Sequence, residues 1–73
     1  MNLAPGNLVS NRWAGYTPMY DVIHGTFVAE FGSSEIGMVL DFRYSTTDVP
    51  YIQILTTRGA RGWIRCERVE VIR

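Results

Sequence analysis

The sequence predicts an all-β fold, a small barrel of five to six short antiparallel strands with a long loop after the first strand. Apolar residues recur with a period of two wherever a period can be read, which is typical of strands, and no window shows a sustained helical stripe. In a chain of 73 residues a flat sheet would leave its edges and one face uncovered, which a barrel avoids. No linker, repeat or low-complexity tract interrupts the chain, so we expect one domain over residues 1–73.

Six segments alternate in the manner of strands, with turn-forming residues between most of them. In chain order they cover residues 7–13, 26–31, 37–44, 51–56, 62–66 and 68–72. Pro50 directly precedes the fourth segment and would begin that strand, because proline cannot donate a hydrogen bond to a ladder. The stretch from Ala14 to Gly25 is the longest without clear alternation, and we interpret it as the long loop.

Alternation also assigns the two faces of each strand. In residues 37–44 the apolar side comprises Met38, Leu40, Phe42 and Tyr44, opposite Val39, Asp41 and Arg43. This is the pattern of a half-buried strand. In residues 51–56 both faces carry apolar groups, as in a central strand. In residues 62–66, Ile64 and Cys66 lie opposite Trp63 and Arg65.

The charge balance argues against a dedicated nucleic-acid binder. Seven basic and seven acidic residues cancel, so the chain lacks the net positive charge of such proteins. The charges are unevenly distributed, since residues 58–73 hold five arginines against Glu67 and Glu70. All seven bases are arginine, which suits bidentate or stacked contacts, although a biased genome produces the same pattern.

No set of residues in the sequence describes a reaction. Cys66 is the only cysteine and has no Cys or His at ligand spacing, so we expect no internal disulfide and no metal site. His24 lies three residues after Asp21, but the sequence supplies no nucleophile for it to activate. Residues 59–62 lack the spacing and the lysine of a phosphate-binding loop. We therefore expect no catalytic residues, no cofactor and no enzymatic activity.

The sequence also carries no recognisable membrane or export signal. The start lacks a basic stretch followed by an apolar run of signal-peptide length. Nowhere do about 18 apolar residues run together, the length that a membrane-spanning helix needs. We therefore expect a soluble, intracellular protein with no membrane partner.

Basic and aromatic residues around the predicted hairpin are candidates for binding nucleic acid. Arg58, Arg61 and Arg65 cluster there, and Tyr51 and Trp63 lie on the strands that lead into and out of the turn. Cations beside stackable rings suit single-stranded nucleic acid, the cations for phosphates and the rings for bases. The alternative is a solvated arginine edge that discourages unwanted strand pairing, with Trp63 packed against the barrel.

The predicted long loop is the candidate protein interface. Trp13, Tyr16, Met19 and Tyr20 fall within eight positions, and these residue types are enriched where proteins meet. The alternative is that the loop folds over the open end of the barrel and caps its core. Both can hold if part of the loop packs inside and Tyr16 or Met19 stays free for a partner.

The second half of the chain resembles a Src-homology-3-like barrel. The segments that carry the resemblance are Glu35–Leu40, Tyr51–Leu55, Gly62–Ile64 and Val69–Ile72, and Pro5–Arg12 is similar to the first strand of such barrels. In this family a Gly-Trp-aliphatic strand follows a hairpin, and a single helical turn and a short last strand come next. Its peptide-binding members carry a Pro and a Tyr in that turn, where this chain has Arg65 and Arg68.

Small proteins of tailed bacteriophages often have this look, so the resemblance implies a virion component or an accessory protein in the host cytoplasm. From the residues we expect a non-catalytic protein-interaction or structural module that docks to a protein partner or to itself. The alternative function is a small nucleic-acid-binding barrel that uses the arginine-rich hairpin.

Overall fold

The computed structural model describes residues 3–72, which form a single all-β sheet with one turn of 3-10 helix. In chain order the elements are β1 (Leu8–Asn11), β2 (Tyr16–Tyr20), β3 (Phe27–Gly32), β4 (Ile36–Tyr44), β5 (Pro50–Thr56), β6 (Arg61–Arg65), η1 (Cys66–Arg68) and β7 (Val69–Val71). The strand order is β3-β2-β6-β5-β4-β1-β7 and every pairing is antiparallel. The all-β prediction is confirmed, with seven strands where five to six were expected.

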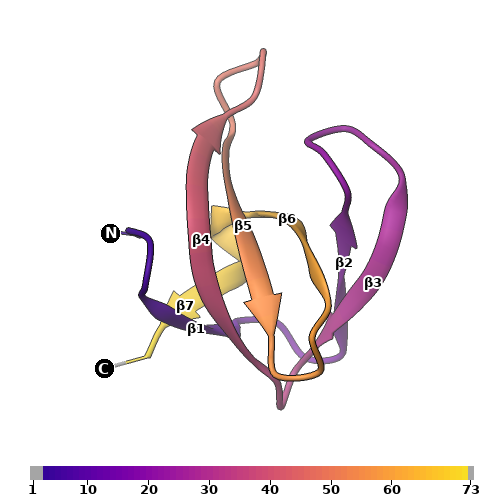
Figure 1. Ribbon diagram of the computed structural model, residues 1–73, viewed down its shortest axis with the longest axis vertical. Coiled ribbons are helices and arrows are strands. Elements are labelled where there is room, and N and C mark those ends of the chain that lie inside the picture. The colour runs from indigo at the N-terminus through magenta and orange to yellow at the C-terminus, as the bar shows by residue number, and fades with distance from the viewer. Residues whose placement is uncertain (1–2, 73) are drawn as a thin grey trace.

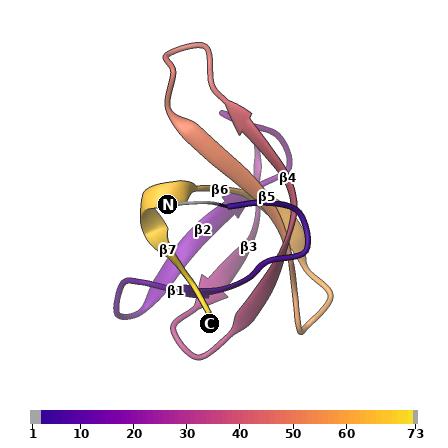
Figure 2. The same cartoon turned by 90° about the vertical axis from the view of Figure 1, so that its left-hand side faces the viewer.

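The sheet curls around its core but is not closed by hydrogen bonds. Strands β3 and β7 are its two edges. Figure 1 shows the β2–β3 hairpin on one side of the tall β4–β5 pair and the short β1 and β7 strands on the other. Figure 2, turned by 90°, brings β1, β7 and the turn η1 toward the viewer. No helix in residues 3–72 is long and apolar enough to cross a membrane.

The prediction of a long loop from Ala14 to Gly25 is wrong, because β2 lies within this stretch. Thr17 and Met19 are buried, and the exposed Pro18 between them completes an alternation of period two. Pro18 disguised this strand in the sequence, since proline usually interrupts a ladder. In the structure β2 pairs with β6 only at Tyr20, so no ladder on that side needs an N–H from Pro18.

The faces expected for residues 37–44 are also wrong, because β4 contains a β-bulge. The register runs from Val39↔Ile54 directly to Asp41↔Gln53, which leaves Leu40 as the extra residue. Val39 is therefore buried and Met38 is 38% exposed, while Phe42 beyond the bulge packs against the core. A bulge bends a long strand, and β4 is the longest strand of this sheet.

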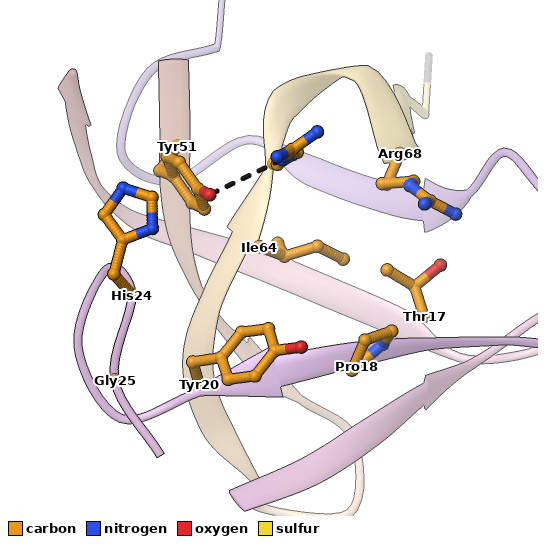
Figure 3. Close-up of a pocket in the computed structure, with 9 residues that line it drawn as sticks. Thr17, Pro18, Tyr20, His24, Gly25, Tyr51, Ile64 and Arg68 are labelled. Carbon is orange, nitrogen blue, oxygen red and sulfur yellow. Dashed lines mark hydrogen bonds between the residues drawn. The ribbon is translucent and has the colours of Figure 1, made fainter. Parts of the chain in front are cut away.

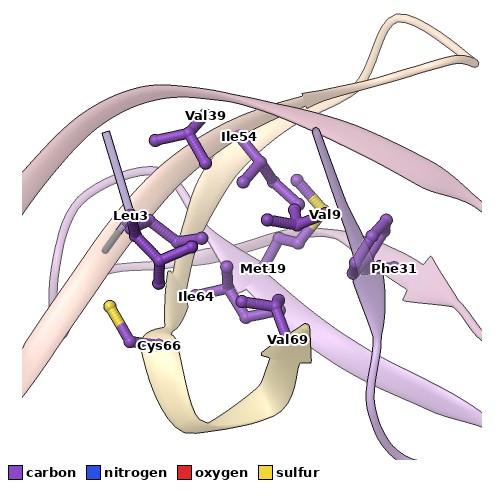
Figure 4. Packing of buried hydrophobic residues seen from close by; sticks show 10 residues of the cluster. Leu3, Val9, Met19, Phe31, Val39, Ile54, Ile64, Cys66 and Val69 are labelled. Carbon is purple, nitrogen blue, oxygen red and sulfur yellow. The ribbon is translucent and has the colours of Figure 1, made fainter. Parts of the chain in front are cut away.

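The core collects the inward side chains of every strand. Its fully buried members are Phe31, Met19, Ile52, Ile54, Ile64, Val9, Val39 and Val69. Figure 4 shows these side chains converging from all seven strands, with Cys66 at the margin. Cys66 is buried, and burial raises the pKa of its thiol to about 11.

A buried polar cluster ties the β2–β3 hairpin to β1. The side-chain amide of Asn11 donates to the backbone oxygens of Phe31 at 2.9 Å and Gly15 at 3.3 Å. Its Oδ1 accepts from the Trp13 N–H and the Thr17 hydroxyl, both at 3.1 Å. This satisfies Thr17, whose polar side chain otherwise faces the core, and explains how a threonine can occupy an inward position of β2.

Candidate binding pocket

A pocket of about 390 Å³ opens where β2 and β6 diverge. The two strands meet at Tyr20↔Trp63 and are unpaired beyond it. The pocket is lined by Thr17, Pro18, Tyr20, His24, Gly25, Tyr51, Ile64, Arg65 and Arg68. These residues come from β2, the loop after it, β5, β6 and η1, so five separate segments of the chain build the site (Figure 3).

Aromatic rings form one wall of the pocket. Tyr51 is nearly buried, and the His24 ring meets it edge-on at a centroid distance of 5.8 Å and an angle of 70°. Tyr20 lies across from them on β2 (Figure 3). Edge-to-face pairs of this kind hold both rings in defined orientations, so this wall is partly pre-organised.

The position of His24 depends on a tightly organised hairpin tip. One oxygen of the Asp21 carboxylate accepts from the N–H groups of Val22 at 2.7 Å and Thr26 at 2.8 Å. His24 itself has a left-handed backbone with φ 63°, which is unusual for a residue with a side chain. A Cβ on Gly25 would collide with the Asp21 carboxylate and the Val22 backbone, so only glycine fits there.

Two arginines face the rings from the side of β6 and η1. Arg65 donates from Nε to the Tyr51 hydroxyl at 3.4 Å and from Nη1 to Glu67 at 3.3 Å. These two contacts raise the pKa of Arg65 further, so its guanidinium remains charged. Arg68 stacks over the Trp13 ring at 5.5 Å, and no carboxylate of residues 3–72 lies within 4.0 Å of it. Arg68 is thus the cation at the pocket that is available to an anion.

The protein-interface candidates are divided between the surface, the pocket and the core. Trp13 is 50% exposed and Tyr16 is 68% exposed, so both can meet a partner. Tyr20 lines the pocket. Met19 is fully buried in the core, so its expected availability to a partner is wrong. The period of β2, which points Met19 inward, is the physical reason.

The nucleic-acid candidates do not form one surface. Arg58 is held by Glu35 through bonds of 2.7 and 3.1 Å, and it also donates to the Glu30 backbone oxygen at 2.6 Å. Arg61 is exposed and lies outside the pocket, whereas Arg65 lines it. Trp63 is only 7% exposed and lies under the guanidinium of Arg43 at 5.9 Å. Its ring is therefore covered instead of being offered to a base.

The structure unites one candidate from each set, Tyr20 and Arg65, with three further residues, of which the sequence had placed only Tyr51 beside a candidate surface. Tyr51, Arg68 and His24 join them only through the pairing of strands far apart in the chain. No local motif could reveal this, because the pocket is defined by the divergence of β2 and β6. The one local signal was the spacing of Asp21, His24 and Gly25, which marks an organised turn.

A second, smaller hollow of about 260 Å³ lies beside Leu3, Phe42, Tyr44, Pro50, Cys66 and Glu67. It contains fewer polar groups and is more open. Among residues 3–72 no group of three or more His, Cys, Asp or Glu side chains could hold a metal ion. The larger pocket is accordingly the better candidate for a binding site.

No protein-family model, curated protein or solved structure matches this chain.

Proposed function

We propose that the protein is a non-catalytic interaction module that binds a short segment of a partner protein in the pocket between β2 and β6. The observation that carries this proposal is the meeting of Tyr20, Tyr51 and His24 with Arg68, whose charge has no carboxylate partner in residues 3–72. Rings provide a large contact area at low entropic cost, and an arginine gives direction by pairing with an anion.

The lining defines the chemistry of the segment. An aromatic or proline side chain would pack on the accessible rings of Tyr20 and His24, and a neighbouring Asp or Glu would accept hydrogen bonds from Arg68. The exposed Trp13 ring, which lies under Arg68, would extend the contact beyond the pocket. We therefore propose an acidic segment with at least one ring as the ligand.

Pairing of the arginines favours a protein ligand over nucleic acid. Of the arginines in residues 3–72, four are ion-paired with carboxylates: Arg12, Arg43, Arg58 and Arg65. A surface that follows a phosphate backbone needs several free cations in one field, because affinity arises from neutralised phosphates. One free arginine at the pocket suits a single carboxylate better.

The resemblance to Src-homology-3-like barrels enters the proposal as architecture. The hairpin of β5 and β6, the turn η1 and the short β7 follow in the order that this family shows, which supports a barrel of that kind. The proposal that the protein is a bacteriophage virion component or accessory protein rests on this resemblance alone.

Binding can be tested by NMR titration with short peptides that combine Asp or Glu with Tyr, Phe or Pro, and with matched peptides in which Lys replaces each acid. We expect the acidic peptides to shift the amide signals of Tyr20, His24 and Arg65. Arg68→Gln should weaken peptide binding about tenfold, the usual loss for a charge-assisted hydrogen bond. Arg61→Gln, an exposed arginine outside the pocket, is the control. Equal binding of acidic and basic peptides would contradict the proposal.

Nucleic-acid binding remains the second candidate, since rings beside Arg65 and Arg68 also suit a base and its phosphate. It can be tested with labelled single- and double-stranded oligonucleotides at low and near-physiological salt. Tight binding that weakens steeply with salt and is lost on removal of Arg65 and Arg68 would replace the peptide proposal.

A further inference from the structure

The outer surface of the sheet carries an aliphatic face that is remote from the pocket. It is formed by Leu8, Ile36, Met38, Leu55 and Ile72, whose exposed fractions are 45, 41, 38, 37 and 40%. Met38 pairs with Leu8 on one side and with Leu55 on the other. The N–H of Ile72 bonds to the Leu8 carbonyl at 2.8 Å, so the row continues to the end of β7.

This face is a continuous feature of the sheet. Directly opposed residues on neighbouring strands have side chains on the same face, about 5 Å apart. Ile72, Leu8, Met38 and Leu55 therefore form one row across four strands, and Ile36 lies beside Met38, two residues along β4. A cluster of exposed aliphatic side chains on a small protein usually marks an interaction site.

Opposite charges flank the face on its two sides. Beyond Leu55 the next opposed residue is Arg61 on β6, which is exposed and has no carboxylate within 4.0 Å among residues 3–72. On the other side Glu70 on β7 lies two residues before Ile72, opposite Ser10, and is well exposed. Its one ion pair in these residues is a long contact of 3.8 Å with Arg12. Such exposed pairs contribute little, so Glu70 is free to change partner.

We propose that this aliphatic face joins two copies of the chain into a symmetric dimer. Placing a two-fold axis parallel to β4 at Met38 puts Met38 against Met38 of the second copy and Leu8 against Leu55. The same operation brings Arg61 of each copy to the Glu70 end of the other. The face thus brings apolar residues against apolar residues and opposite charges toward each other, as a self-complementary two-fold interface requires.

The size of the chain gives a second reason for self-association. A domain of about 60 to 70 residues hides only about 60% of the surface that its unfolded chain exposes, so assembly adds burial that the monomer lacks. Five partly exposed aliphatic residues are fewer than a standard interface uses. We therefore expect a weak dimer, with a dissociation constant in the micromolar to millimolar range.

The proposed dimer leaves both pockets open. Arg61 marks the end of the face on β6, whereas the pocket begins past Trp63 toward Arg65. A dimer would consequently present two pockets to a partner, independently of which ligand they bind.

Sedimentation velocity over a concentration series tests the dimer directly. We expect a shift from monomer to dimer as concentration rises, and Met38→Glu should weaken the association by about tenfold or more, because it places two like charges together at the axis. Val22→Glu, an equally drastic change at an exposed aliphatic residue outside the face, should leave it unchanged. A monomer at every concentration up to the millimolar range would overturn the proposal.

Charge reversal tests the orientation of the two copies. Arg61→Glu alone and Glu70→Arg alone should each weaken the dimer, and the double variant should recover most of the loss because the pairs are restored with exchanged signs. If the double variant instead lost dimer affinity by the sum of the two single losses, this arrangement would be excluded.

Cross-linking provides a readout that does not depend on destabilising the protein. Cys66 is the only cysteine and is buried, so Met38→Cys introduces the one exposed thiol. Mild oxidation should link two copies through this position, and Val22→Cys should give far less linked dimer under the same conditions. Equal yields from the two variants would show that the axis does not pass near Met38.

Discussion

The β4–β5 pair and the β2–β3 hairpin are held in place by different forces. The first is a long ladder from Gly37↔Thr56 to Tyr44↔Pro50, with Val39, Ile52 and Ile54 beneath it in the core. The hairpin joins the neighbouring β6 at Tyr20↔Trp63 and is tied to β1 by the side chain of Asn11. The comparison teaches that apolar packing builds this fold, whereas a few polar contacts position the wall of its pocket.

The largest effect is expected in the packed half. Ile54 is fully buried, and it lies close enough to Gly37 that a Cβ there would come within 3.0 Å of its side chain. Ile54→Ala should lower the free energy of unfolding by about 3 kcal/mol, because it leaves a cavity in a core that cannot collapse around it. Urea unfolding followed by tryptophan fluorescence measures this.

The outward neighbour provides the control for this cavity. Leu55 on the same strand is 37% exposed, so Leu55→Ala should cost much less than Ile54→Ala. If the two losses were equal, the distinction between the inner and outer faces of β5 would not hold.

A smaller loss is expected from the polar link to the hairpin. Asn11→Asp keeps the shape of the side chain but removes the amide group that donates to Phe31 and Gly15. Two backbone oxygens then face a carboxylate, and unfolding should become easier by about 2 kcal/mol. The same urea experiment, combined with NMR spectra, would show whether signals of the pocket wall move with the loss.

Thr17→Val measures the contribution of the Thr17 hydroxyl separately from that of the Asn11 amide. It removes one hydroxyl donor to Asn11 while keeping the buried volume, so a loss of about 1 kcal/mol is expected. A cost as large as that of Asn11→Asp would assign the stabilisation to Thr17 instead.

The smallest effect concerns the ion pair that joins Glu35, in the turn between β3 and β4, to Arg58 in the β5–β6 turn. Hydrogen bonding by Arg58 lowers the pKa of Glu35 below its ordinary value of 4.5. In the unfolded chain Glu35 takes up a proton first as the pH falls, so its contribution is full above about 4.5 and is lost as the pH falls through the lower, folded value. Glu35→Gln should therefore make stability less dependent on pH in this acid range.

Unfolding free energies measured across the acid range, compared between the natural protein and Glu35→Gln, test this point. Glutamine still offers an oxygen to the Gly32 N–H, so the substitution removes mainly the charge. Asp48→Asn, at a loop residue outside any ion pair of residues 3–72, is the matched control. Parallel curves for all three proteins would contradict the assignment.

The inward faces of β5 and β6 could be predicted from the sequence, whereas those of β2 and β4 could not. Ile52 and Ile54 alternate without interruption, and their burial follows directly. The same is true of Ile64 and Cys66 on the strand and turn that follow. These residues obey the simple rule of period two because no bulge shifts the register between β5 and β6.

The rest depended on interactions between distant residues. Pro18 and Thr17 obscure the alternation of β2 in the sequence. A threonine at an inward position becomes plausible only once its hydroxyl is known to donate a hydrogen bond to the Asn11 side chain. The pocket could not be predicted for the same reason, since Arg68 and His24 meet Tyr51 only after the sheet has curled. Charge pairing likewise required the fold, because Arg58 and Glu35 are 23 positions apart.

The extra residue at Leu40 has a consequence for how this chain tolerates insertions and deletions. Val39 and Phe42 both face inward although three positions separate them, because the bulge absorbs one residue. Loss of one residue there would leave an ordinary alternating strand with every partner retained, at the cost of some bend. Loss of one residue within β5 would instead turn its isoleucines toward water. One strand of the central pair therefore has room to shorten during evolution, and its partner has none.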